Sequence, residues 1–231
     1  MKNVLTTIFI FLVCACCNGQ QGTWTVKPGE SINEALGDSV IFRYPQFETG
    51  SIYFRNENVS TARLNLNLLN GEMEFINGTG DTMTVANEST IRYIVIQADS
   101  FYFDNKVYLE LIHSNATARL AKAMALEPVA VEKVGGYDQP SSSSSINSIS
   151  YFSNGNQFAK LAQNKILVLR KKNSYFIGDN FNHFLPASKR NTYKLFSKQE
   201  KAIDNFLKEN KIVFVKEDDL LKLIDMLEKN N

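Results

Sequence analysis

The chain has 231 residues, with 25 lysines and arginines against 24 aspartates and glutamates, and only three cysteines. This near-neutral balance lacks the basic excess or stripe of a nucleic-acid-binding protein, so nucleic acid is excluded as a partner. All three cysteines lie in the first 17 residues, which leaves none for a disulfide, a thiol nucleophile or a cysteine-based zinc site in the folded part.

Residues 1–19 have the pattern of a secretory signal peptide. Lys2 precedes an apolar run, Val4–Val13, that is shorter than the roughly 20 residues needed to cross a bilayer, and small Gly19 offers a cleavage point. The residues up to Cys16 also resemble a bacterial lipobox, so lipidation of Cys16 is an alternative to cleavage near Gly19. We therefore expect an exported protein that is periplasmic, secreted or lipid-anchored to the outer membrane, with no transmembrane helix in its mature chain.

Residues 20–134 predict an antiparallel β domain of the sandwich or barrel-like kind. Apolar and polar residues alternate over Ala62–Leu68, as in a half-buried strand, and Asn70-Gly71 favours a hairpin. Turn signals recur about every 8–12 residues, which is typical of such folds. The predicted strands are Ser51–Arg55, Ala62–Leu68, Met73–Ile76, Met83–Ala86, Ile91–Gln97, Phe101–Phe103, Val107–His113 and Ala116–Leu126.

Residues 135–147 predict a flexible linker, because glycine, proline and a run of serines gather there. The last part, 148–231, opens with three predicted strands: Ser148–Phe152, Lys165–Arg170 and Ser174–Gly178.

The C-terminal residues predict a helix–strand–helix segment that packs as a lid on the β domain. Ser197–Glu200 has the capping-box pattern and predicts a helix to about Asn210, and Ile212–Val215 predicts a short strand. A second helix begins near Asp218, where apolar residues recur at helical spacing on one face. These residues are Leu220, Leu223, Ile224 and Leu227. The fold class is therefore mainly β, or α+β overall.

Several segments together resemble an uncharacterised family of secreted or periplasmic β-rich proteins of the Bacteroidota. They are Gly50–Phe54, Leu64–Ile76, Gly80–Thr82, Phe101–Phe103, Tyr108–Ile112 and Glu132–Tyr137. The resemblance covers most of the mature chain and implies a compartment, but no reaction and no site residues. Asp38-Ser39-Val40 and Asp81-Thr82-Met83 also resemble the O-glycosylation acceptor pattern of such bacteria, with Ser39 and Thr82 as the modified residues.

No sequence motif predicts a catalytic centre, a cofactor or a metal ion. HExxH, GxSxG, Walker and GxGxxG patterns are absent from the sequence. Asp179 and His183 lie four residues apart, but a catalytic zinc requires three protein ligands in fixed geometry, so the pair is interpreted as part of a polar loop. His113 is interpreted as a solvated residue at a strand end.

Two functions remain open at this point. The first is a non-enzymatic module that binds an envelope protein or a glycan, since aromatic side chains recur on the predicted strands. These are Tyr53, Phe101, Tyr102, Phe103 and Tyr108. The alternative is a carboxylate-dependent glycan hydrolase, because Glu72 and Glu74 share a strand face and Glu110 could lie beside them. The oligomeric state is not predicted.

Overall fold

The computed structural model describes residues 22–134, 140–141 and 165–229. Its strands are β1 (Thr23–Val26), β2 (Glu48–Phe54), β3 (Val59–Asn67), β4 (Glu72–Ile76), β5 (Thr82–Thr84), β6 (Ile91–Ile96), β7 (Asp99–Asp104), β8 (Val107–Ser114), β9 (Ala118–Val134), β10 (Pro140–Ser141), β11 (Lys165–Asp179) and β12 (Phe184–Pro186). Its helices are α1 (Ile32–Leu36), α2 (Asp38–Ile41), α4 (Lys189–Leu195), α5 (Glu200–Asn210) and α6 (Glu217–Lys229), with short 3₁₀ turns η1 (Glu88–Thr90) and η3 (Ser197–Gln199).

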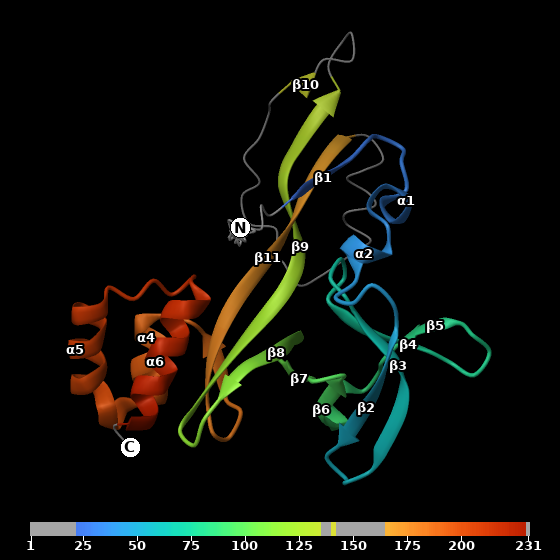
Figure 1. Cartoon of the computed structure of the whole chain (residues 1–231). Helices are drawn as coiled ribbons and strands as arrows, with labels where there is room; N and C mark the ends of the chain where they lie inside the picture. Colours follow the sequence, from blue (N-terminus) through green and yellow to red (C-terminus); the bar gives the residue numbers. More distant parts are fainter. Residues whose placement is uncertain (1–21, 135–139, 142–164, 230–231) are drawn as a thin grey trace, which may run out of the picture.

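All the described strands belong to one large open sheet, and neighbouring strands are antiparallel (Figure 1). The order along the sheet is β1-β11-β9-β8-β7-β6-β2-β3-β4-β5, while β10 pairs with β9 and β12 with β11. Helices α4, α5 and α6 lie together beside one end of the long β9–β11 ribbon (Figure 1). The expected mainly β, antiparallel fold with C-terminal helices is confirmed.

The segment after the expected linker adds a long strand to this sheet, between β1 and β9. The prediction of separate strands at Lys165–Arg170 and Ser174–Gly178 is wrong, because β11 runs through both and pairs with β9 along its whole length. The polar residues between them resemble a turn in sequence, but on a strand they are accommodated by ion pairs such as Lys172 with Glu127. Of the linker 135–147, only Pro140–Ser141 is described, and it pairs with β9. Ser148–Phe152 lies outside the described residues.

The largest apolar cluster joins the strands to α1 and α2. Phe101, Leu64 and Ile94 are fully buried in it, and Ile32 and Ile41 from the two short helices pack against the same cluster. Burial of such side chains is the main favourable contribution to folding.

One polar residue of β3 is as deeply buried as its apolar neighbours. The alternation predicts a solvent-facing Asn65, but its side chain is fully buried. Its amide nitrogen donates to the carbonyl oxygens of Tyr44 at 2.9 Å and Gln46 at 3.1 Å, and its oxygen accepts from the Tyr44 amide at 3.1 Å. These bonds satisfy the buried amide and fasten the segment before β2 to the sheet.

The C-terminal helices pack on the β9–β11 ribbon through the predicted apolar stripe of α6. Leu220, Leu223, Ile224 and Leu227 are all fully buried, and they pack with Leu120 and Ile177 of the sheet. The prediction that this segment packs on the β domain is therefore confirmed at its last helix. Within the described residues, none of the helices has both the length and the apolar character needed to cross a bilayer.

Two local predictions for the same segment are wrong. Ser197 does not cap a helix: it opens the turn η3, and α5 begins at Glu200 without a side-chain cap. Ile212–Val215 is not a strand, because the chain turns there. The Val213 amide donates to Asp219 at 3.0 Å, and the segment pairs with none of the described strands.

Replacing Gly50 by alanine should destabilise the protein by about 1–3 kcal/mol, the usual cost of overpacking. A Cβ at this position in β2 would lie 2.6 Å from the Val95 carbonyl oxygen and 2.9 Å from Leu64 Cδ1. Gly78→Ala is the matched control, since a methyl group there would meet no atom within 4 Å and its effect should stay within about 0.5 kcal/mol. Urea unfolding measures the stability of both variants. Equal midpoints would contradict the close approach of Val95 and Leu64 to Gly50.

Candidate functional site

Four aromatic side chains form a continuous row across one face of the sheet, which we call the tyrosine row. Tyr53 of β2 stacks on Tyr93 of β6, with ring centroids 4.6 Å apart and planes 21° from parallel. Tyr93 contacts Tyr102 of β7 at 6.0 Å, and Tyr102 contacts Phe184 of β12 at 5.7 Å. The three tyrosines are half-buried, and only Phe184 is buried. The row is thus a partly accessible aromatic surface held by four strands.

Sheet register explains why these rings meet. Tyr53 and Tyr93 are directly opposite in the β2–β6 pair, and the β6–β7 register of Ile94 with Phe101 places Tyr93 next to Tyr102. Side chains alternate between the faces of a strand, so Phe101 points into the core while Tyr102 points to the row.

Two arginines lie beside the tyrosine row. The Arg92 guanidinium lies 5.9 Å from the centre of the Tyr93 ring and is exposed. Arg119 lies at the same distance over Tyr102 and donates a 3.1 Å hydrogen bond to its hydroxyl. Cation–π contacts of this kind orient both partners. At the other end, Val59 of β3 is opposite Tyr53 and is 54% exposed, which extends the apolar surface.

The aromatic residues singled out in the sequence divide between the two faces. Tyr53 and Tyr102 belong to the row, whereas Phe101 and Tyr108 are buried in the core and Phe103 packs against Tyr108 at 4.9 Å. Tyr93 and Phe184 complete the row, although sequence reasoning did not single them out. The period-two pattern of β6 contains the signal for Tyr93, but Phe184 joins only because β12 folds back on β11.

No protein-family model, curated protein or solved structure matches this chain. The chemistry and geometry of its own residues are therefore what distinguishes one function from another.

The predicted carboxylate pair lies together on β4. Asn70 Nδ2 donates to Glu72 at 3.0 Å and to Glu74 at 3.5 Å, so one amide bridges the two acids. Burial raises the pKa of Glu74, and the nearby charge of Glu72 raises it further, although hydrogen bonds from Asn67 and Asn70 act in the opposite direction. A hollow of about 440 Å³ beside Glu74 is also lined by Glu30.

Glu110 lies in a different charged cluster and does not join this pair. It is 4% exposed, and Arg43 Nε contacts its carboxylate at 2.8 Å while Lys122 Nζ contacts it at 3.0 Å. Burial alone would raise the pKa of Glu110, but the bonds from Arg43 and Lys122 outweigh it and hold the pKa below its usual value. Arg43 also reaches Asp99, which accepts a 2.7 Å bond from the Tyr44 hydroxyl. The arrangement is a partly buried ion-pair network, centred on buried Glu110, that ties the N-terminal segment to the sheet.

Asp179 and His183 contact each other within a single loop. The His183 ring nitrogen Nδ1 lies 2.9 Å from Asp179 Oδ2, and Asp179 Oδ1 accepts bonds from the amides of Phe181 and His183. His113 is likewise on the surface, 3.5 Å from Asp225. Within the described part of the chain, no three histidine, cysteine or acidic side chains gather in a way that could hold a metal ion.

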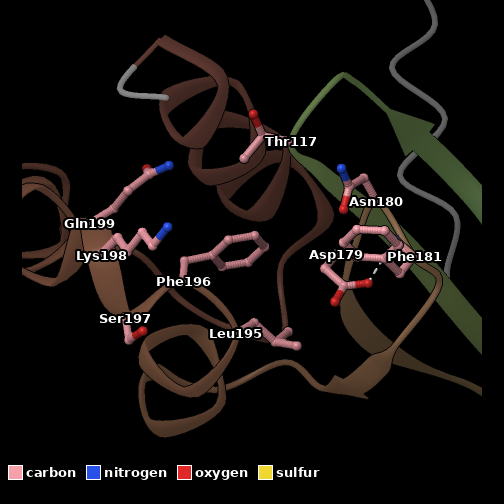
Figure 2. A pocket seen from close by; sticks show the side chains of 9 residues that line it. All are labelled: Thr117, Asp179, Asn180, Phe181, Leu195, Phe196, Ser197, Lys198 and Gln199. Atoms are coloured by element: carbon pink, nitrogen blue, oxygen red, sulfur yellow. Dashed lines mark hydrogen bonds between the residues drawn. The ribbon is translucent and has the colours of Figure 1, made fainter.

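A pocket lies at the junction between the sheet and the C-terminal helices, and we call it the junction pocket (Figure 2). Its volume is about 440 Å³. Figure 2 shows Asp179, Asn180 and Phe181 on the sheet side, facing a helical side that runs from Leu195 to Gln199. Thr117, from the turn between β8 and β9, closes a third side.

Two of the three predicted modification sites lie within the described residues. Cys16 lies outside the described residues. Ser39 is exposed in α2 and Thr82 is exposed at the start of β5, so both hydroxyls are reachable from solvent. Their modification stays a prediction.

Proposed function

We propose that this protein is exported to the cell envelope, where it binds a partner protein through the tyrosine row without catalysing a reaction. The tyrosine row carries the proposal. Tyrosine, phenylalanine and arginine are enriched in the cores of protein–protein interfaces, whereas lysine and acidic residues are depleted there. Tyr93 at the centre of the row, with Arg92 over it, has the composition of an interface hot spot. Lys2 and the apolar run Val4–Val13 support export.

Ring geometry favours a protein over a glycan as the partner. Tyr53 and Tyr93 stack on each other, so one face of each ring is already covered. The covered faces are unavailable for stacking on a sugar ring, whereas tyrosine hydroxyls and ring edges suit hydrogen bonds and edge-to-face contacts with protein side chains.

The arginines indicate the chemistry of the partner surface. Arg92 is exposed beside the row, and Arg119 lies along Tyr102. A partner that places carboxylates beside its apolar contacts would gain charge complementarity at both positions, which increases the association rate and the specificity.

Affinity capture from native envelope membranes tests this proposal. Tyr93→Ala should lower affinity for the captured partner by about 30-fold, as expected for a hot spot worth about 2 kcal/mol. Because Tyr93 is half-buried, Arg92→Glu is the second variant: it changes an exposed residue and should also release the partner. Val215→Ala, an exposed apolar residue on the helical side, is the control that should keep it.

Identical capture by the wild type and both row variants would overturn the proposal. Retention by envelope polysaccharide, lost in the same variants and without any captured protein, would assign the row to a glycan instead.

The alternative is a carboxylate-dependent glycan hydrolase, and the pKa of Glu74 favours it. A glutamate whose pKa is raised by burial, with a second carboxylate on the same strand face, is what a glycosidase requires of its general acid and its nucleophile. In this mechanism Glu74 would protonate the leaving-group oxygen. Glu72 would attack the sugar as the nucleophile or stabilise the positive charge of the transition state. Release of reducing ends from envelope or plant polysaccharide that disappears in Glu74→Gln and in Glu72→Gln would establish the hydrolase and reject a purely binding role.

A further inference from the structure

We propose that a hollow at the turn between β2 and β3 binds a ligand with one carboxylate attached to a short apolar group. Its volume of about 580 Å³ lies within the roughly 300–1,000 Å³ of small-molecule sites. The residues that line it are Phe54, Arg55, Asn56, Asn58, Ser89 and Thr90. None of the residues of the tyrosine row is among them, so the inference does not depend on the proposed function.

Arg55 is the only charged residue among those that line the hollow. Its side chain is exposed, and Nε donates to the Ser89 carbonyl at 3.0 Å, which holds the guanidinium in place. Its two terminal nitrogens form no hydrogen bond or ion pair with any described residue. A guanidinium held through Nε keeps its terminal N–H groups for the two oxygens of a carboxylate.

Uncharged donors lie beside this guanidinium. Asn56 Oδ1 accepts a bond from the Asn58 amide at 3.2 Å, so the free atom of the Asn56 side chain is its donor nitrogen Nδ2. The Ser89 hydroxyl forms no hydrogen bond within the described part of the chain. All three residues are exposed, so a ligand in the hollow can reach these groups.

Backbone hydrogen bonds hold the two sides of the hollow together. The Arg55 amide donates to the Thr90 carbonyl at 2.8 Å, which joins the end of β2 to the residue before β6. The Phe54 amide donates to the Asn58 carbonyl at 2.9 Å and closes the β2–β3 turn. The lining residues are therefore positioned before a ligand arrives, which lowers the entropic cost of binding.

The apolar part of the hollow and the surrounding charges select the class of anion. Phe54 is half-buried and offers its ring to an apolar group. Glu57 and Glu88 adjoin the lining residues in sequence without lining the hollow, and their charges oppose a multiply charged anion such as phosphate more than a monoanion. A carboxylate beside a short aliphatic group meets both conditions. A free carboxylic acid and the C-terminal residue of a peptide share this chemistry.

Chemical-shift mapping on the whole protein tests the proposal with four probes at millimolar concentration: N-acetyl-L-leucine, 4-methylpentanoate, N-acetyl-L-leucinamide and inorganic phosphate. The two carboxylates should give saturable shifts at Phe54, Arg55 and Ser89, and the neutral leucinamide should bind about tenfold more weakly. Tighter binding of N-acetyl-L-leucine than of 4-methylpentanoate would assign the hollow to a peptide C-terminus, and the reverse order would assign it to a free acid.

Two exposed residues supply the variants. Arg55→Gln should lower the affinity for both carboxylates about tenfold, and Asn58→Asp should also lower it, because it adds a negative charge to the hollow. Arg63→Gln is the matched control and should keep the wild-type affinity. Arg63 is also exposed and also donates from Nε to a backbone carbonyl, that of Phe47, but it does not line the hollow.

Four outcomes would each overturn the inference. They are the absence of shifts with both carboxylates, equal binding of the leucinamide, tighter binding of phosphate, and an affinity that is unchanged in Arg55→Gln. Tyr93→Ala should leave carboxylate binding intact while it releases the envelope partner, so failure of one proposal is distinguishable from failure of the other.

Discussion

Phe101→Ala should lower the free energy of unfolding by about 3–5 kcal/mol, the range for removing a buried aromatic side chain. Phe101 is fully buried at the centre of β7, opposite Ile94 of β6 and Glu110 of β8. Alanine would leave a cavity in the largest apolar cluster, and neighbouring strands cannot collapse into it without breaking their register. Domains are stable by only about 5–15 kcal/mol, so this single change should remove a large fraction of the total.

Phe181→Ala is the matched control for this prediction. The residue type and the substitution are identical, but Phe181 is 75% exposed, so its loss should alter stability by less than about 0.5 kcal/mol. Urea or thermal unfolding followed by circular dichroism compares the two. A Phe101→Ala protein as stable as the control would show that the strand arrangement around β7 is wrong.

Glu110→Gln should destabilise the protein by about 2 kcal/mol at neutral pH, since it removes the buried carboxylate that accepts charge-assisted bonds from both Arg43 and Lys122. Arg43 and Lys122 would lose their shared carboxylate, and Arg43 also fastens the N-terminal segment to the sheet. Glu209→Gln, on the exposed surface of α5, is the control and should have almost no effect.

The pH dependence of stability gives the same network a second signature. The pKa of Glu110 is lowered in the folded state, so its contribution is present above the unfolded-state value of about 4.3 and is lost as the pH falls through the folded-state value. Glu127 is buried between Arg170 and Lys172, and its pKa is also lowered, so it contributes to the same loss of stability at acidic pH. Unfolding measured across acidic pH should therefore show a weaker acid dependence in Glu110→Gln than in the wild type. Superimposable pH profiles would contradict the assignment.

Local sequence patterns are sufficient for much of the secondary structure. Alternation locates β3, and helical spacing locates the buried stripe of α6 with Leu220 and Leu223. The patterns fail where a polar run does not end a strand, as in β11, and where an apolar run has no neighbouring strand to pair with, as at Ile212–Val215. Helix α4 is not predicted, because the residues that bury it come from other parts of the fold.

The sequence by itself determined which residues alternate and which recur at helical spacing, because those periods depend only on near neighbours in the chain. Tertiary structure alone decided that Asn65 is buried, that Tyr93 meets Tyr102, and that Thr117 and Gln199 face one pocket. The physical reason is that these features depend on segments brought together by folding, and their distances are set by strand register and layer packing. Charge balance and the position of the cysteines predict that neither nucleic-acid binding nor thiol chemistry is the function; the surfaces that suggest a function exist only once the sheet has formed.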